Sequence, residues 1–335
     1  MNNLFNKVAM ATDIHFGGKG NSKQFNTDIV DFFTWFIKES KERGCESCII
    51  LGDWHDSRSS INVLTLNYSL QVLTMLNEAF DSTYIITGNH DLFYREKRDV
   101  HSLVVGDHLK NISVVDKLTE IGNVSFLPWL VENEWKNCAK SKAKYIFGHL
   151  ELPGFKMNAM IDCPDHGGIN GKHFKNQDYV FTGHFHKRQY KDNIHYIGNP
   201  FGHNYGDAGD FERGACFLEW GGKPEYVNYE DAPKYHSVEL SYLLENIDNI
   251  VSDKAYIKVN DDIGINYEEN LAIREKFADL NVREFTLSPK KNDYDQEYDP
   301  SEKFVSVDSL VISELGKIES ETFNNQVLIK MYEDL

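Results

Sequence analysis

The 335-residue chain lacks the features that mark membrane and secreted proteins. It contains no apolar run that approaches the roughly 18 residues needed to cross a bilayer. Residues 1–7 have neither the charged start nor the apolar stretch of a signal peptide. We therefore expect a cytoplasmic protein without a membrane-spanning segment.

Cysteines are also scarce, and their number and spacing argue against a disulfide framework. Cys45 and Cys48 form a Cys-x-x-Cys pair, but no second pair exists to complete a zinc site, and the pair leads into a predicted strand. We predict reduced, partly buried thiols, with a redox or metal role as the alternative. The five cysteines are Cys45, Cys48, Cys138, Cys163 and Cys216.

Positive charge is in short supply, since 35 Lys and Arg face 52 Asp and Glu, for a net charge of −17. This balance counts at first against a nucleic-acid partner, because phosphates favour a basic surface. The distribution is uneven, however: residues 231–335 hold 23 acidic and 11 basic residues, whereas residues 1–230 hold 29 and 24. Several acids of the first part are candidate metal ligands, and two divalent ions would bring that part close to neutral.

The first hundred residues show an alternation of strand and helix patterns. Strands are predicted over 7–12, 47–51 and 83–87, and helices with apolar residues at helical spacing over 25–42 and 62–80. This order implies parallel strands with right-handed crossovers, and it places the loops after those strands along one sheet edge. Strand-like runs dominate afterwards, so we expect an α/β fold with a second sheet packed on the first. The later strands are predicted over 112–115, 124–127, 144–147, 178–181, 195–197, 215–219 and 225–227.

The composition changes near residue 231, and we expect four parts. A large domain covers 1–230, and a small strand-helix-strand unit covers 231–289, with its elements over 254–260, 267–280 and 281–288. A polar linker follows over 290–303, and the segment 304–335 holds two amphipathic helices over 307–318 and 321–335. Two short helices have little core of their own, so we expect them to dock on a partner or on the body.

Five segments of the large domain consist of a short apolar run followed by Asp, His or Asn. In the last of them, residues 183–186, two histidines at positions i and i+2 of an extended segment point to the same side. Carboxylate and amide oxygens suit hard divalent ions, whereas Mn, Fe and Zn also accept imidazole nitrogen. The set is too large for one ion and about right for two that share a carboxylate. Its members are Asp13, His15, Asp53, Asn89, His149, His184 and His186.

Such a pair of ions favours phosphoester hydrolysis. Two ions roughly 3.5–4 Å apart hold the attacking and leaving oxygens of a phosphoryl group and lower the pKa of a bound water. Phosphatases and nucleases share this chemistry, so the ligands alone leave the substrate open.

The five motifs resemble those of the calcineurin-like metallophosphoesterase superfamily. They are Asp-x-His, Gly-Asp-x-x-Asp, Gly-Asn-His-Asp, Gly-His-x-Glu and Gly-His-x-His, in this order between residues 13 and 186. The resemblance implies a two-sheet sandwich flanked by helices. It implies one ion held by Asp13, His15, Asp53 and His186, and a second held by Asp53, Asn89, His149 and His184. It also implies that His90 is the catalytic histidine beside the scissile phosphate, steered by Asp91.

The rest of the chain resembles the nuclease subunit of SbcCD-type double-strand-break repair complexes, and most closely that of tailed phages. The resemblance rests on the turn 197–200, on the stretches 127–129 and 148–155, and on the small unit and terminal helices. It implies a DNA exonuclease and endonuclease that uses Mn²⁺, with Mg²⁺ as the alternative. The unit 231–289 would cap the active site, and the helices of 304–335 would bind an SMC-like ABC-type ATPase. A phage-encoded chain would act in the host cytoplasm, and formation of a homodimer stays open.

One position departs from the pattern of the cellular members, which often carry a histidine three residues after the shared aspartate. Here Asp56 occupies that place, with His55 beside it, and we take His55, Asp56 and Arg58 as candidate substrate contacts. Other basic residues near the motif loops are candidates for phosphate contact or ordinary surface charge, namely Arg95, Arg98, Lys187 and Arg188. The remaining histidines are taken as ordinary surface or core residues, namely His101, His108, His166, His173, His195, His203 and His236.

Two alternative functions are weighed against the nuclease. A phosphatase or small phosphodiesterase would use the same fold, but Gly-Asn-His-Asp in place of Gly-Asn-His-Glu, and the lack of Arg-Gly after Asp56, count against protein phosphatases. A DNA-end-binding scaffold with an inactive metal centre is the non-enzyme alternative, and the intact ligand set counts against it.

Overall fold

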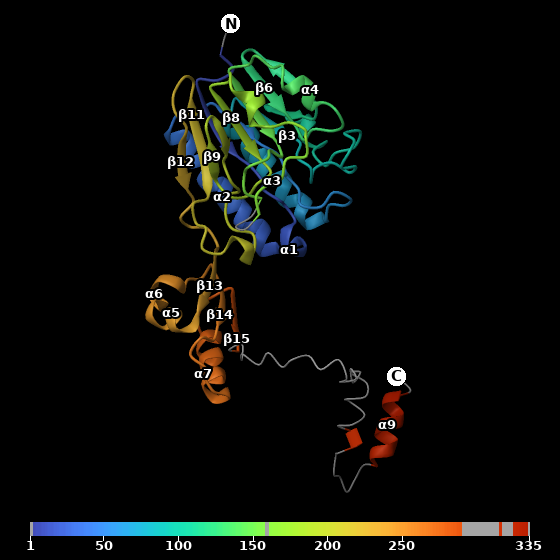
Figure 1. Ribbon diagram of the computed structural model, residues 1–335, viewed down its shortest axis with the longest axis vertical. Helices are drawn as coiled ribbons and strands as arrows, with labels where there is room; N and C mark the ends of the chain where they lie inside the picture. The colour runs from blue at the N-terminus through green and yellow to red at the C-terminus, as the bar shows by residue number, and fades with distance from the viewer. Residues whose placement is uncertain (1–2, 158–160, 290–314, 317–323, 334–335) are drawn as a thin grey trace. The chain divides into compact units, whose positions relative to one another are not determined.

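The computed structural model describes residues 3–157, 161–289, 315–316 and 324–333. The chain divides into two compact units, Met1–Lys290 and Lys291–Leu335. The first unit contains two six-stranded sheets and a smaller three-stranded sheet (Figure 1). This is the mixed α/β sandwich that the sequence predicts.

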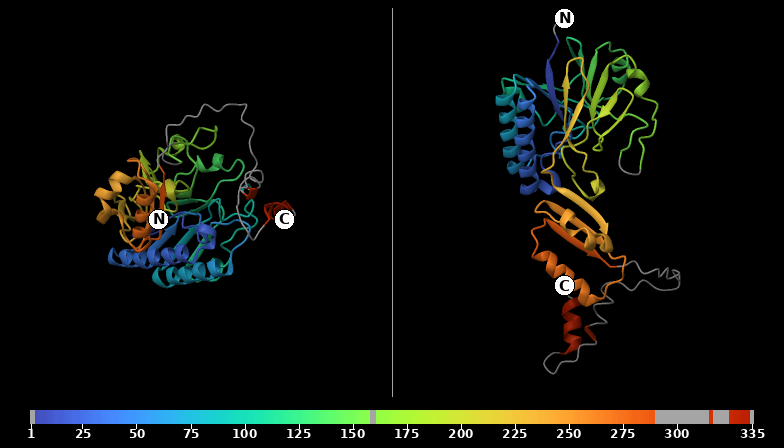
Figure 2. Two further views of the ribbon diagram at one scale, coloured as in Figure 1. Left: turned by 90° about the horizontal axis from the view of Figure 1, so that it is seen from below. Right: turned by 90° about the vertical axis from the view of Figure 1, so that its left-hand side faces the viewer.

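The first sheet has the strand order β12-β11-β1-β2-β3-β4. Its parallel strands are β1 (Lys7–Ala11), β2 (Ser47–Ile50), β3 (Ser82–Ile86) and β4 (Ile112–Val115), and β11 (Gly214–Glu219) and β12 (Glu225–Asn228) extend it in antiparallel fashion. The crossover helices α2 (Lys23–Glu42) and α3 (Val63–Ala79) cover one face, as Figure 2 shows. The short helix α1 (Gly18–Asn21) precedes α2, and a 3₁₀ turn, η1 (Gly106–His108), precedes β4.

The second sheet has the order β5-β6-β7-β8-β10-β9. Strands β6 (Val124–Leu127), β7 (Tyr145–His149), β8 (Tyr179–Gly183) and β10 (Ile194–Tyr196) are parallel, and β5 (Thr119–Ile121) and β9 (Gln189–Lys191) are antiparallel edges. Helix α4 (Trp135–Cys138) and the loops that follow β7 contribute to the core on its outer face. The two edge strands were not predicted because each spans only three residues with little apolar character.

The alternation of side chains along β1 explains the layering. Ala9 and Ala11 belong to the core beneath α2 and α3, whereas Val8 and Met10 belong to the core between the two sheets. Successive strand residues point to opposite faces, so a strand buried on both sides reads as one continuous apolar run. Burial on both faces fixes the register of β1, and thereby the place at which Asp13 leaves the sheet.

The smaller sheet consists of three parallel strands, β13 (Lys234–Glu239), β14 (Ala255–Asn260) and β15 (Glu284–Ser288). Helices α5 (Leu240–Glu245), α6 (Ile247–Ile250) and α7 (Tyr267–Ala278) connect them and share a core with them. The predicted strand-helix-strand unit corresponds to β14, α7 and β15. Strand β13 was missed because only Tyr235 and Val238 are clearly apolar within it. The predicted domain boundaries at 230 and 289 stay predictions.

The second unit contains helix α9 (Asn325–Glu333), which falls within the predicted segment 321–335. The predicted linker 290–303 and most of the predicted helix 307–318 lie outside the described residues. Among the helices that the structure describes, none combines the length and apolarity required to cross a membrane.

Candidate metal centre

The predicted ligands lie at or just beyond the carboxyl ends of five parallel strands, three in the first sheet and two in the second. Asp13 and His15 follow β1, Asp53 follows β2, and Asn89 follows β3. His149 ends β7, and His184 and His186 follow β8. The backbone N–H of His184 donates to both carboxylate oxygens of Asp13 at 3.1 Å, so the ligand loops of the two sheets meet directly.

One cluster of possible ligand atoms contains Asp13, His15 and Asp53, whose atoms lie within 4.8 Å of one another. All three side chains are buried. The Nε2 atom of His186 lies 4.0 Å from Asp13 Oδ1 and joins this group. These are the four residues predicted to hold the first ion, and the structure brings them together.

A second cluster contains Asp53, His149 and His184. The side-chain oxygen of Asn89 lies 3.1 Å from His149 Nε2 and 2.9 Å from His184 Nδ1. Asp53 Oδ2 lies 3.4 Å from His149 Nε2 and 3.7 Å from His15 Nε2, so it faces both clusters. The predicted shared carboxylate therefore sits between the two groups of ligands.

The backbone is strained at the ligands. Asp13, His15, Asp53 and His184 have φ angles of 52°, 54°, 54° and 91°, a region that non-glycine residues rarely adopt. Such strain persists only where the surrounding structure enforces it, and it concentrates at functional sites. Here each of the four residues lies within four positions of the carboxyl end of its strand.

The imidazole rings are oriented by neighbouring acceptors. His149 Nδ1 lies 2.8 Å from the carbonyl oxygen of Leu51, which leaves Nε2 facing Asp53 and Asn89. Burial lowers the pKa of His149, but the Asp53 carboxylate, together with the charge of Asp13 and the hydrogen bond to Leu51, raises it to about 9. Burial lowers the pKa of His186 to about 4. At neutral pH His149 thus holds a proton that an ion would displace, whereas His186 is already neutral.

The residues present fit two divalent ions. Both ring nitrogens of His15 are buried without a well-directed hydrogen bond among the described residues, although Asp56 Oδ1 lies 3.2 Å from Nδ1. Buried polar atoms normally have partners, and an ion would supply one. Carboxylate, amide and imidazole donors together suit Mn, Fe or Zn.

His90 stands at the edge of the centre, with its ring 4.9 Å from that of His15. The predicted steering by Asp91 is not what the structure shows, because His90 Nδ1 lies 2.7 Å from the backbone oxygen of Asp56. The Asp91 carboxylate instead accepts from the backbone N–H groups of Trp54, His55 and Gly88. Burial and the charge of Asp53 raise the pKa of Asp91 to about 6. Asp91 thus ties the loop after β2 to the loop after β3.

The candidate substrate contacts differ in accessibility. His55 is buried, and its two ring nitrogens lie 2.8 and 2.9 Å from the hydroxyls of Ser102 and Ser69. A contact between His55 and a substrate would have to break these bonds. Asp56 is half-buried beside His15. The Nε atom of Arg58 is buried without a hydrogen-bond partner among the described residues.

Two of the other basic candidates have structural partners. Arg98 pairs with Glu134 and donates to the carbonyl oxygen of Trp129. Arg188 donates to Asn228 and lies over the ring of Tyr226. Arg95 lies over the Trp129 ring at 5.8 Å, and Lys187 is exposed.

Sequence reasoning missed two residues of the centre. Trp129 packs against His184, with ring centroids 5.0 Å apart. His203, treated as an ordinary histidine, lies against both His15 and His186. It follows the turn at 197–200, and no motif marks it.

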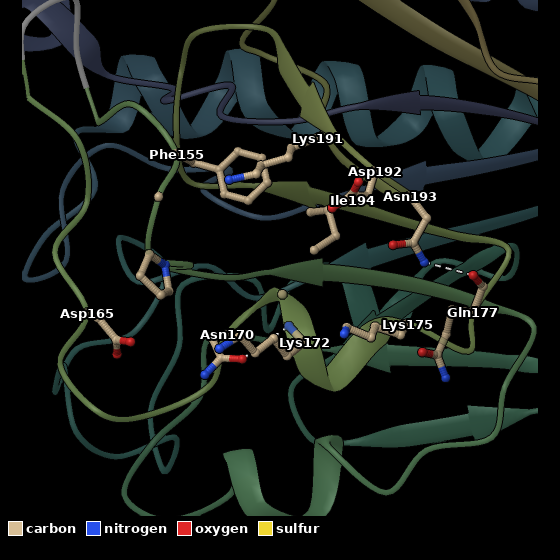
Figure 3. Close-up of a pocket in the computed structure, with 13 residues that line it drawn as sticks. Phe155, Asp165, Asn170, Lys172, Lys175, Gln177, Lys191, Asp192, Asn193 and Ile194 are labelled. Atoms are coloured by element: carbon tan, nitrogen blue, oxygen red, sulfur yellow. Dashed lines mark hydrogen bonds between the residues drawn. The ribbon is translucent and has the colours of Figure 1, made fainter.

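Two cavities lie near the loops after β7. One of about 230 Å³ is lined by His149 and Glu151 together with Trp129 and Trp135, and it adjoins the centre. A larger one of about 830 Å³, shown in Figure 3, lies between β9, β10 and the 3₁₀ turn η2 (Gly171–Phe174). Among the described residues, no ligand candidate lines the larger cavity, so we do not associate the chemistry with it.

Comparison with known proteins gives one family match. A family model described as calcineurin-like phosphoesterase matches residues 7–188. Exonuclease subunit 1 of Enterobacteria phage T4 is 28% identical over 215 residues, which are 61% of this chain and 62% of that protein. The aligned region therefore spans less than two thirds of the relative.

Similarity to solved structures is weak. Nuclease MPE of Pseudomonas putida shares 17% identity at a TM-score of 0.30, over 56% of this chain and 66% of that one. The protein TT1561 of Thermus thermophilus shares 12% identity at a TM-score of 0.38, over 67% of this chain and 99% of that one.

Proposed function

Because the chain belongs to the calcineurin-like phosphoesterase family, we propose that it is a metal-dependent phosphodiesterase that cleaves DNA as an exonuclease and endonuclease. The observation that carries the proposal is the pair of ligand clusters that share Asp53. DNA is the proposed substrate because the T4 relative is named an exonuclease subunit.

Asp13, His15, Asp53 and His186 would hold one ion, and Asp53, Asn89, His149 and His184 the other. When bound, two such ions activate a phosphodiester as Lewis acids and lower the pKa of a water molecule. Mn²⁺ is the proposed ion and Mg²⁺ the alternative, because imidazole nitrogen suits Mn²⁺ better than the harder Mg²⁺.

His90 is the proposed general acid. Its Nδ1 atom lies 2.7 Å from a backbone carbonyl oxygen, which can only accept, so Nδ1 carries the proton of that bond. Nε2 then remains to hold a second proton and to deliver it to the leaving oxygen. The backbone N–H of His90 also donates to Asp53 Oδ1 at 2.8 Å, so His90 and the shared ligand are positioned together.

Asp91 is proposed to act on the site's geometry and not on the substrate. Its buried carboxylate binds backbone N–H groups on two loops. These loops carry Asp53 and His90, so Asp91 holds the ligand and the proposed acid in a fixed relation.

The function is tested by offering purified protein three substrates side by side with Mn²⁺: a linear DNA duplex, a small phosphodiester and a phosphopeptide. We expect cleavage of the duplex, and its loss when Mn²⁺ is removed by chelation. Turnover of the small substrates alone would favour the phosphatase or small-phosphodiesterase alternative. Absence of all turnover by protein that contains metal would favour the inactive DNA-end-binding scaffold.

The proposed partner is an SMC-like ABC-type ATPase. The T4 relative is named as a subunit, and α9 exposes the apolar side chains of Val327 and Met331 on one helix. Deletion of 304–335 is expected to abolish co-purification with the ATPase while Mn²⁺-dependent cleavage of single-stranded DNA persists. Unchanged co-purification would refute the assignment of this segment.

A further inference from the structure

We propose that His203 is an additional metal ligand, which completes a group of three imidazoles with His15 and His186. One nitrogen atom from each ring lies within 4.8 Å of the others. The proposal rests on the proposed metal-dependent function, since it concerns the ion held by Asp13, His15, Asp53 and His186.

The three rings surround a common space. Ring centroids are 5.4 Å apart between His15 and His203, 5.3 Å between His186 and His203, and 5.1 Å between His15 and His186. Each pair is arranged edge to face, with interplanar angles of 84°, 70° and 61°. The closeness of the rings agrees with the short distances among their nitrogen atoms.

Two nitrogen atoms in this space lack hydrogen-bond partners. His203 Nε2 and His15 Nε2 are buried and have no hydrogen-bond partner among the residues that the structure describes, and His15 Nδ1 has only Asp56 Oδ1 nearby, at 3.2 Å. A single ion would satisfy nitrogens from more than one of these rings, which the neighbouring side chains do not do. Buried polar atoms without partners are rare in native proteins and call for such an explanation.

The loop that carries His203 is tied to the loop that carries His186. The backbone N–H of His203 donates to Asp207 Oδ2 at 2.8 Å. The buried Arg213 side chain binds Asp207 Oδ1 at 2.9 Å and also donates to the carbonyl oxygen of His186 at 2.9 Å. One guanidinium therefore fixes two of the three imidazoles relative to each other.

The surroundings of the His203 ring do not require a histidine for packing. Phe25 and Phe201 contact it edge to face at 5.2 and 5.6 Å. A phenylalanine would fill this aromatic pocket without leaving a buried nitrogen unpartnered. The aromatic packing therefore does not account for the ring nitrogen of His203, whereas a bound ion would.

The extra imidazole has a consequence for metal choice. Three imidazoles and two carboxylates would surround the first ion, whereas the second has two imidazoles, one carboxylate and one amide. Nitrogen-rich sites favour Mn, Fe, Co and Zn over Mg²⁺. We expect the first site to fill first and to retain Mn²⁺ in the presence of excess Mg²⁺.

The test compares the full chain with His203→Phe, which preserves the aromatic packing, and with His195→Phe as the matched control. His195 is also a buried histidine, but its Nδ1 bonds the hydroxyl of Tyr226, away from the ligands. Metal-free proteins are titrated with Mn²⁺, and histidine nitrogens coupled to the first ion are counted by pulsed electron paramagnetic resonance. We expect His203→Phe to weaken the first site at least about tenfold and to remove one coupled nitrogen, and His195→Phe to match wild type.

An unchanged nitrogen count in His203→Phe would overturn the proposal. With a lowered affinity it would show that His203 acts through another residue, and with an unchanged affinity that His203 has no role at the site. Failure of the wild-type protein to bind Mn²⁺ would instead refute the proposed function. Circular dichroism of the metal-free variants checks folding, and His203→Leu replaces the first variant if that one does not fold.

Discussion

His90 is proposed to act on the substrate and not to bind metal. Its replacement therefore separates catalysis from metal binding. His90→Ala removes the imidazole but leaves the backbone N–H that supports Asp53. We expect hydrolysis to fall by about 100- to 10,000-fold, the range for loss of a general acid, with two Mn²⁺ retained per chain. Metal analysis and cleavage of a linear duplex measure both effects. Loss of metal from this variant would mean that His90 is a ligand.

Gly88 lies so close to the shared ligand Asp53 that there is no room for a side chain at this position. A Cβ atom at this position would lie 2.2 Å from Asp53 Oδ1 and 2.4 Å from Asp53 N, although the backbone itself would accept alanine. Gly88→Ala must therefore displace Asp53, and we expect a destabilisation of about 1–3 kcal/mol together with loss of Mn²⁺ affinity.

Gly168→Ala provides the control for this substitution, because no atom lies within 4 Å of the Cβ position there. Thermal unfolding and Mn²⁺ titration of both variants decide the matter. Equal behaviour of the two alanine variants would show that the contact at Gly88 is not critical.

The ligand residues could be predicted from the sequence, whereas the connections among them could not. Asp, His and Asn after apolar runs identify strand ends, and parallel strands bring those ends together. His203 follows no comparable signal, because it reaches the centre through a loop that Arg213 holds in place. The hydrogen bonds that Asp91 accepts could not be predicted either, because their donors are backbone N–H groups, which every residue except proline has.

A buried ion pair joins helix α2 to the start of strand β15. The guanidinium of Arg283 donates to both oxygens of Asp28 at 2.6 and 2.7 Å, and the two side chains are only 8% and 4% exposed. Removal of one partner leaves a buried charge unpaired, so we expect Arg283→Met to cost about 3–5 kcal/mol of stability.

The double variant Asp28→Leu with Arg283→Met removes both charges, and we expect it to regain most of that loss. Urea unfolding of wild type, both single variants and the double variant measures the coupling. Additive effects in this cycle would contradict a direct interaction between the two elements.

At the level of elements, the long buried strands and helices were predictable, and the short or polar ones were not. The pattern at 25–42 and 62–80 has a clear helical period, and α2 and α3 occupy nearly those ranges. Strands β5 and β9 are edge strands of three residues each. They form because they pair with a neighbouring strand and not because their residues are apolar. The contact between Asp28 and Arg283 joins residues 255 positions apart and has no local signature.

Across the whole molecule, the centre depends on two sheets that present their strand ends at one place. The first sheet supplies Asp13, His15, Asp53 and Asn89, and the second supplies His149, His184 and His186. The sequence predicts both sheets, but their mutual packing follows from side chains that alternate between the two cores. The negative charges of the buried Asp13 and Asp53 carboxylates at the centre would be offset by the bound ions.

Two ions that share Asp53 should depend on its carboxylate, and the Mn²⁺ content and DNA cleavage of Asp53→Asn measure this dependence. Asp192→Asn is the matched control, because Asp192 has a φ of 55° against 54° for Asp53 but lies exposed at a turn. Asparagine tolerates this backbone region, so both variants should fold. We predict two Mn²⁺ per chain and full cleavage for wild type and Asp192→Asn, with at most one Mn²⁺ and no cleavage for Asp53→Asn. Two Mn²⁺ and undiminished cleavage in Asp53→Asn would show that Asp53 does not hold the two ions.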